Sequence, residues 1–424
     1  MEIAKYSIGT GDRFGLQGNA QLAAVKKAHD NGVELAIVWN KSHREHGIVG
    51  TTQQALREEA NQAVNKIGWK GQFFVDADHI GLDNVDLFLQ SSDFFTLDVA
   101  EYIGEKADDK SLKSFLEKHR RFIGELMIPG IDQPLSISGE LLQAIAEKYL
   151  YSIQQAGEIY RYIAANKNNG DFITEVSMDE TAAPQSPVEM LFILAAIADE
   201  EIPAQTIAPK FSGRFNKGVD YIGNITRFRQ EFEEDLCIIN YAVQKFGLPA
   251  NLKLSVHSGS DKFSIYQPIR ELIDKYEAGI HVKTAGTTWL EELIGLAEAG
   301  GEGLAIAKQI YESSYGRFDE LCSPYASVID IDRGALPTPA EIKAWTGEQY
   351  VSALWTGEQY LSALRHDQSC PDYDLNIRQL LHVGYKVAAE LGDTYLDALR
   401  VNRDVIAKNV TENLYERHIM PLFI

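Results

Sequence analysis

Two carboxylates and a histidine follow an apolar run at FFVDADHI, residues 73–80. A buried strand that ends in Asp78 and His79 has to satisfy their charges with a metal, a substrate or each other, because an unpaired buried charge is costly. His257 and His281 also lie near the ends of short apolar segments, LKLSVH and GIHVKT. Imidazoles combined with carboxylates are preferred ligands of zinc, manganese, cobalt and nickel. If the fold brings the three histidines together, they form a divalent metal site.

Strand periodicity adds a further carboxylate, Glu175, from the segment DFITEVSMDE. Alternate residues of a strand face the same side, so Glu175 and Asp179 share one face, and we expect Glu175 to point inward. The same rule creates a difficulty for Asp78 and His79, which are adjacent, because a regular strand turns only one of them inward. We therefore expect the strand to end or to bulge near Asp78.

The elements that position these residues alternate along the chain between short apolar segments and segments with helical spacing. Eight such β-then-α units predict an α/β fold, a (β/α)8 TIM-type barrel, over residues 1–300. A helical C-terminal extension, residues 301–424, is expected to pack on the barrel, and one additional helix is expected before the fifth strand. The predicted strands are 4–9, 34–39, 72–78, 94–99, 172–178, 205–211, 252–257 and 279–284.

In such a barrel the active site lies at the carboxyl ends of the strands. All eight predicted strands end in polar or charged residues, whereas the middle of each strand is mainly apolar. A single histidine at a strand end is usually a hydrogen-bonded core residue. Three histidines at equivalent strand ends favour a metal site, so we predict His79, His257 and His281 as ligands.

Composition narrows the class of partner. The chain has 424 residues, 45% of them hydrophobic, and a formal net charge of -21. This charge would repel nucleic acid and anionic membranes, so a small-molecule substrate is favoured. We find no apolar run of membrane-spanning length and only three widely spaced cysteines, which predicts a cytoplasmic protein without disulfides. The sequence leaves open whether the chain forms a homo-oligomer.

Two further motifs need an interpretation. GTGDRFG, residues 9–15, has the spacing G-x-G-x-x-x-G rather than the G-x-G-x-x-G of a dinucleotide loop, so no nicotinamide is expected. Asp12 and Arg13 in this loop are instead predicted to contact substrate. WTGEQYVSAL at 345–354 is followed at once by a near-identical copy at 355–364. We interpret it as a local duplication in a surface segment.

The motifs GTGDRFG, VDADHI, EVSMDETAAPQSP, KFSGRFNKGVDYIGN, LSVHSGSDKFSIY and NIRQLLHVGYK resemble the tagaturonate epimerase family over nearly the whole chain. That family interconverts tagaturonate and fructuronate, and its relatives include tagatose 4-epimerases. The resemblance implies a metal-dependent barrel in which Asp78 acts as base and Glu175 as acid. It also implies that His79, His257 and His281 bind the cation.

The implied reaction constrains the chemistry. The two sugar acids differ at C4, which is β to the ketone and carries no acidified hydrogen, so inversion needs cleavage of a bond. A retro-aldol step that breaks C3–C4 meets this need. A ketose isomerase, a 3-epimerase or an aldolase on the same barrel stays an alternative, as does a non-catalytic sugar-binding barrel. The substrate is either a keto-uronate or a neutral ketose such as tagatose or fructose.

Several polar side chains are candidates to hold the hydroxyls or the carboxylate of the substrate, with a surface salt bridge as the alternative role for each basic residue. They are Asp12, Arg13, Lys210, Ser258, Asp261, Lys262, Lys283 and Arg378.

Overall fold

The computed structural model describes residues 1–167, 171–284, 286–354 and 374–424. Eight parallel strands close into a barrel in the order β1-β2-β3-β4-β7-β8-β9-β10, with β10 paired to β1. The predicted barrel and all eight of its strands are confirmed. The strands are β1 Tyr6–Gly11, β2 Leu35–Ser42, β3 Phe73–Ile80, β4 Phe94–Asp98, β7 Ile173–Ser177, β8 Thr206–Ala208, β9 Lys253–His257 and β10 Ile280–Lys283.

The barrel interior changes from apolar to charged along the strands. A small apolar cluster that includes Phe74, Phe94 and Ile173 fills the end near the strand starts. Two residues further along the same strands stand Asp76, Thr96 and Glu175, all fully buried. Because alternate residues share a face, the same inward face carries both the apolar plug and the charged layer above it.

In the described part of the chain, helices follow the strands around the outside of the barrel, and side-chain caps fix where several of them begin. Ser186, for example, accepts from the Glu189 backbone N–H while the Glu189 carboxylate accepts from the Ser186 N–H, which fixes the start of α6. These helices are α1 Gly18–Asp30, α3 Gln53–Ile67, α5 Gly139–Asn166, α6 Pro187–Asp199, α7 Ile225–Phe246, α8 Tyr266–Lys275 and α9 Thr287–Ala299. Within the described ranges no helix combines the length and the apolar character of a membrane span.

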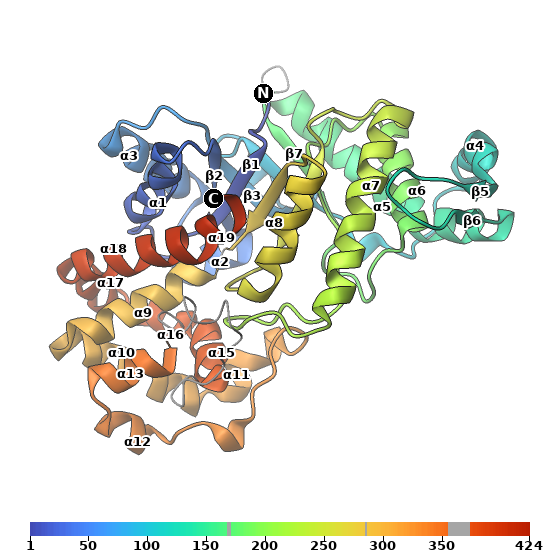
Figure 1. Ribbon diagram of the computed structural model, residues 1–424. Coiled ribbons are helices and arrows are strands. Elements are labelled where there is room, and N and C mark those ends of the chain that lie inside the picture. Colours follow the sequence, from blue (N-terminus) through green and yellow to red (C-terminus); the bar gives the residue numbers. More distant parts are fainter. Residues whose placement is uncertain (168–170, 285, 355–373) are drawn as a thin grey trace.

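An insertion between β4 and α5 carries α4 Asp109–His119 and a two-stranded sheet of β5 Gly124–Leu126 and β6 Leu135–Ile137. It projects from one side of the barrel (Figure 1). The sequence predicted a helix here and the long α5, but it gave no sign of the sheet. Three-residue strands that are largely exposed have neither a long apolar run nor a resolvable alternation.

The C-terminal helices pack on the barrel through a shared apolar core. Trp289 and Leu290 of α9 belong to the same buried cluster as Ile310, Tyr350 and Leu380 of the later helices. Figure 1 shows most of these helices below the barrel, away from the N-terminus. They are α10 Gly301–Gly316, α11 Phe318–Cys322, α12 Pro339–Ala344, α13 Gly347–Leu354, α15 Leu375–Val383, α16 Tyr385–Leu391, α17 Asp393–Val401, α18 Arg403–Glu412 and α19 Met420–Phe423.

The first copy of the duplicated segment, residues 345–354, contains the whole of α13. Tyr350 is 1% exposed and donates a hydrogen bond of 2.8 Å to the Ala307 carbonyl, and Leu354 is fully buried. This copy lies at the surface, where Thr346, Glu348 and Gln349 are exposed, while its apolar face packs into the core of the extension. The second copy, residues 355–364, lies outside the described residues.

Candidate active site

The predicted irregularity of the third strand is confirmed. Pairing of β3 with β4 runs through Asp76 and Ala77, then shifts register before it resumes at Ile80. His79 lies at the shift with a φ of 52°, in the left-handed region that side-chain-bearing residues rarely adopt. The bulge lets Asp78 and His79 both face the barrel mouth, where Asp78 contacts Lys283 and His79 contacts Asp98.

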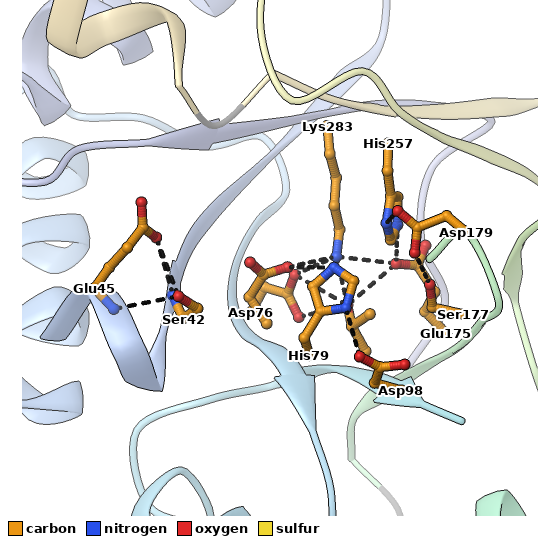
Figure 2. A network of polar contacts seen from close by, with 12 residues as sticks. Ser42, Glu45, Asp76, His79, Asp98, Glu175, Ser177, Asp179, His257 and Lys283 are labelled. Carbon is orange, nitrogen blue, oxygen red and sulfur yellow. Dashed lines mark hydrogen bonds and ion pairs between the residues drawn. The ribbon is translucent and has the colours of Figure 1, made fainter. Parts of the chain in front are cut away.

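Lys283 reaches across the mouth from β10 and joins three carboxylates (Figure 2). Its Nζ lies 2.7 Å from Asp76 Oδ2, 3.0 Å from Asp78 Oδ1 and 2.9 Å from Glu175 Oε1, and it also donates to Thr96 Oγ1. The opposite residue on β1 is a glycine, and a Cβ there would lie only 2.9 Å from Lys283 Cγ. This residue is Gly9, the first glycine of GTGDR, and its lack of a side chain leaves room for the methylene groups of Lys283.

This arrangement sets the protonation of the three acids. Burial raises the pKa of Asp76 to about 7, because Lys283 only partly offsets the cost of a charge at this position. For Asp78 and Glu175 burial acts in the same direction, but Lys283 and the nearby imidazoles outweigh it and lower both pKa values. At neutral pH Asp78 and Glu175 are therefore carboxylates, whereas Asp76 titrates in this range.

The two histidines at the mouth are also surrounded by carboxylates. His257 Nε2 lies 2.8 Å from Glu175 Oε1, and His79 Nδ1 lies 3.1 Å from Asp98 Oδ2. Burial opposes protonation of each ring, but neighbouring carboxylates overcome it and raise the pKa of His257 to about 9 and that of His79 to about 10. Without a metal ion both imidazoles are therefore cationic at neutral pH.

A set of three side chains could hold a metal ion. One nitrogen of His79, one nitrogen of His257 and one oxygen of Asp179 all lie within 4.8 Å of one another. His257 Nδ1 is 3.2 Å from Asp179 Oδ2, yet this buried nitrogen makes no hydrogen bond. Two imidazoles and a carboxylate match the donor set of a catalytic divalent cation, which would displace the imidazole protons.

Asp179 was not among the ligands predicted from the sequence, although its shared face with Glu175 was the signal that could have identified it. Its side chain follows β7 and is held by a hydrogen bond of 2.6 Å from Ser177 Oγ. Figure 2 shows Asp179 beside His257, next to Glu175 and Ser177. The strand periodicity continues beyond β7 and delivers this carboxylate to the mouth.

The structure places the predicted ligand His281 one layer lower in the barrel, outside this set. Its Nδ1 is 2.9 Å from Ser7 Oγ, and its ring lies 5.3 Å from that of Phe94. It is fully buried, and burial lowers its pKa to about 3. Lys283, two residues later and about 7 Å further along the strand, occupies the level that the sequence analysis assigned to His281.

Two of the predicted substrate-binding residues organise the loop after β1. Asp12 accepts hydrogen bonds from the backbone N–H groups of Gly15 and Gln17, at 2.8 and 2.5 Å. Arg13 pairs with Glu45 at 3.0 Å and stacks on a tyrosine ring of the extension. Both side chains are buried, so the roles seen are structural and not surface salt bridges.

The loop after β9 is likewise tied to its surroundings. Ser258 Oγ donates to the Lys283 carbonyl at 2.6 Å, and Lys262 Nζ is surrounded by three backbone carbonyls and a hydroxyl. Arg378 of α15 pairs with Asp261 at 2.6 Å. Lys210 is partly exposed, and its backbone N–H donates to Gln185. The SGSDK motif thus anchors the helical extension on the barrel.

The sequence profile of the tagaturonate epimerase family matches residues 1–419. The chain belongs to the tagaturonate epimerase family. It is therefore a carbohydrate epimerase, an enzyme of the isomerase class, and the resemblance noted in the sequence is confirmed.

Individual relatives agree with this assignment. The tagaturonate/fructuronate epimerase of Thermotoga maritima is 26% identical over 97% of this chain and 80% of its own length. A glycerol complex of the fructuronate-tagaturonate epimerase UxaE from Cohnella laeviribosi superposes with a TM-score of 0.79 at 22% identity, covering 100% of this chain and 82% of that protein. The native structure of the same enzyme gives a TM-score of 0.76 at 22% identity, with the same coverage of both chains. These structures share the fold of this chain.

Proposed function

We propose that this protein interconverts tagaturonate and fructuronate by inverting C4, with a divalent metal ion held by His79, Asp179 and His257. The observation that carries the proposal is the convergence of this donor set with Asp78 and Glu175 at the carboxyl ends of the strands. Such a cation would supply Lewis-acid stabilisation to the oxygens of the substrate.

The position of the inverted carbon requires cleavage of a carbon–carbon bond. The hydrogen on C4 is not acidified by the C2 ketone, so removal and return of that hydrogen would be slow. Loss of the C4 hydroxyl proton with cleavage of C3–C4 instead gives an aldehyde at C4 and leaves the electron pair in an enediolate over C2 and C3. Rotation of the aldehyde and re-addition to its other face restores the bond with inverted configuration.

Asp78 is suited to accept the hydroxyl proton. Burial works against its charge, but Lys283 and His79 outweigh this and hold the pKa below its ordinary value, so the side chain is a carboxylate at neutral pH. It is 13% exposed, whereas Asp76 and Glu175 are fully buried beneath it. A general base of this kind contributes a factor of roughly 10² to 10⁴ in rate.

Glu175 supplies the second proton relay. Its Oε1 lies 2.9 Å from Lys283 Nζ and 2.8 Å from His257 Nε2, and its own pKa is held well below the ordinary range. It therefore carries a proton only in passing: it takes one from the Lys283 ammonium and gives it to the new C4 oxygen, and Lys283 recovers a proton from Asp78, which lies 3.0 Å from its Nζ. Burial raises the pKa of Asp76 to about 7, and this side chain contacts the same Lys283 ammonium, so Asp76 can store or release a proton beside it at neutral pH.

The proposal includes the setting of the enzyme. We infer a cytoplasmic location, since Cys237 and Cys322 are buried free thiols that suit a reducing compartment. We also infer that residues 1–300 form the catalytic barrel and that residues 301–424 cover its mouth and brace the loops after β9 and β10.

A product assay tests the function. The protein is stripped with a chelator, supplied separately with manganese, zinc, cobalt or nickel, and incubated with tagaturonate, fructuronate, tagatose and fructose. We expect metal-dependent appearance of the C4 epimer of the sugar acids by NMR. Three-carbon fragments would identify an aldolase, and a changed C3 would identify a 3-epimerase. Binding that raises the melting temperature without any product would indicate a sugar-binding barrel.

A further inference from the structure

A buried imidazole of the extension, His382 on α15, lies beside the barrel mouth. It is 2% exposed, and its Nε2 makes no hydrogen bond. A Cβ added at Gly286, in the loop after β10, would collide with that nitrogen. Gly286 N–H donates to the Gly259 carbonyl, and Gly259 N–H donates to the carbonyl of Lys283, so two backbone hydrogen bonds join the loop beside this nitrogen to the end of β10.

Four basic side chains act electrostatically on this imidazole. Burial together with Arg13, Lys217, Lys262 and Arg378 holds the pKa of His382 well below its usual range. Such a concentration of positive charge is unusual in a chain whose formal net charge is -21. An anion bound among these groups would relieve their mutual repulsion.

Three of the four cations already have oxygen partners. Arg13 pairs with Glu45, Arg378 pairs with an aspartate, and Lys262 is surrounded by oxygens. The ammonium of Lys217 has no hydrogen bond or ion pair with any described residue. It reaches the same loop, because a Cβ added at Gly259 would lie 3.6 Å from its Nζ. The charge of Lys217 is thus available to a ligand.

We propose that Lys217 and His382 bind the carboxylate of the keto-uronate and thereby select the sugar acid over the neutral ketose. The inference rests on the proposed function, because it assumes that the substrate carries its carboxylate two carbons from the C4 that reacts between Asp78 and Glu175. Lys217 supplies the charge, and His382 Nε2–H supplies a directed donor. A neutral ketose has a hydroxymethyl group at that end and gains nothing from the ammonium.

Binding measurements test this assignment. Tagaturonate and tagatose are titrated calorimetrically into the full chain with manganese present, for the wild type, Lys217→Met and His382→Gln. Loss of a charge-assisted hydrogen bond predicts a Kd for tagaturonate raised by about 10- to 100-fold. The Kd for tagatose should stay within about twofold, because the uncharged sugar does not use this contact. Lys217→Arg should recover most of the affinity for tagaturonate.

A matched control removes a cation from the segment between β8 and α7, which also carries Lys217. Arg214 pairs with Asp330 at 2.9 Å and is 45% exposed, so Arg214→Met changes the net charge equally without touching the mouth. It should leave both affinities unchanged. If it weakens tagaturonate as much as Lys217→Met does, the effect is long-range charge and the proposal is overturned. His382 is buried, so its variant can fail to fold. The decisive comparison is therefore the Lys217 variant, because this side chain is partly exposed.

Three other outcomes separate a failure of the carboxylate subsite from a failure of the proposed function. A wild-type protein that binds tagatose as tightly as tagaturonate overturns the subsite even if it epimerises both sugars. A preference for tagaturonate that depends on Lys217 supports the subsite even if no epimerisation occurs, and the proposed function then fails alone. Tighter binding of tagatose 6-phosphate than of tagaturonate would show a phosphate site and overturn the carboxylate assignment.

Discussion

Replacement of Lys283 by methionine removes the charge that three buried acids share. Its ammonium lies between 2.7 and 3.0 Å from Asp76, Asp78 and Glu175, and methionine fills a similar volume without a charge. Removal of one partner from a buried ion pair costs about 3–5 kcal/mol of unfolding free energy, because the remaining charge is left unpaired. We expect Lys283→Met to lose stability in that range at pH 8.

The loss should depend on pH in a definite direction. Without the ammonium the folded-state pKa values of the three acids rise above their unfolded values near 4. An acid whose pKa is raised on folding does not destabilise the protein below its unfolded pKa. Its destabilising effect grows as the pH rises from the unfolded pKa to the folded pKa. Each extra proton bound in the native state recovers about 1.4 kcal/mol per pH unit between these limits. The difference from the wild type should therefore shrink as the pH falls from 8 to 5.

Urea unfolding at pH 5, 6, 7 and 8, followed by tryptophan fluorescence in the presence of a chelator, measures this difference. The control is Lys26→Met, which breaks a half-exposed pair with Asp30 on α1 and should cost no more than about 0.5 kcal/mol at any of these pH values. A loss below 1 kcal/mol at pH 8, or a loss that does not change with pH, would refute the view that Lys283 neutralises the acidic layer.

Three predictions address the chemistry. Asp78→Asn should lower kcat by roughly 10² to 10⁴ while metal content by elemental analysis stays unchanged, and a wild-type rate would remove this residue from catalysis. Asp179→Asn and His257→Ala should each weaken manganese binding in equilibrium dialysis, whereas His281→Asn should not; equal losses in all three would return His281 to the ligand set. Turnover in heavy water should leave C4 of the product free of deuterium by NMR, and label at C4 would exclude the cleavage route.

The barrel could be predicted because buried parallel strands are encoded by continuous apolar runs that end in polar residues. Each of the eight strands has such a run, and the observed strands overlap the predicted ones. The β5 and β6 sheet could not be predicted, because its strands have only three residues each, too few to show an apolar run or an alternation.

The site was predictable to within one layer of the barrel. Alternation correctly turned Glu175 inward, and the adjacency of Asp78 and His79 correctly required a bulge. The height of each side chain along the barrel axis depends on where a strand ends, which periodicity does not encode, and this explains the different position of His281. Partners such as Asp261 and Arg378 are 117 positions apart, so only the folded chain shows that they pair with each other.

The position of Lys283 on the final strand has a consequence for how the barrel assembles. Its acidic partners come from β3 and β7, so an intermediate that lacks β10 would hold their carboxylates at close quarters without a counter-charge. Closure of the ring and neutralisation of the acids are then a single event, which favours all-or-none folding over stepwise addition of strands. Engineers who exchange half-barrels between relatives would have to transfer the lysine and the acids as one unit.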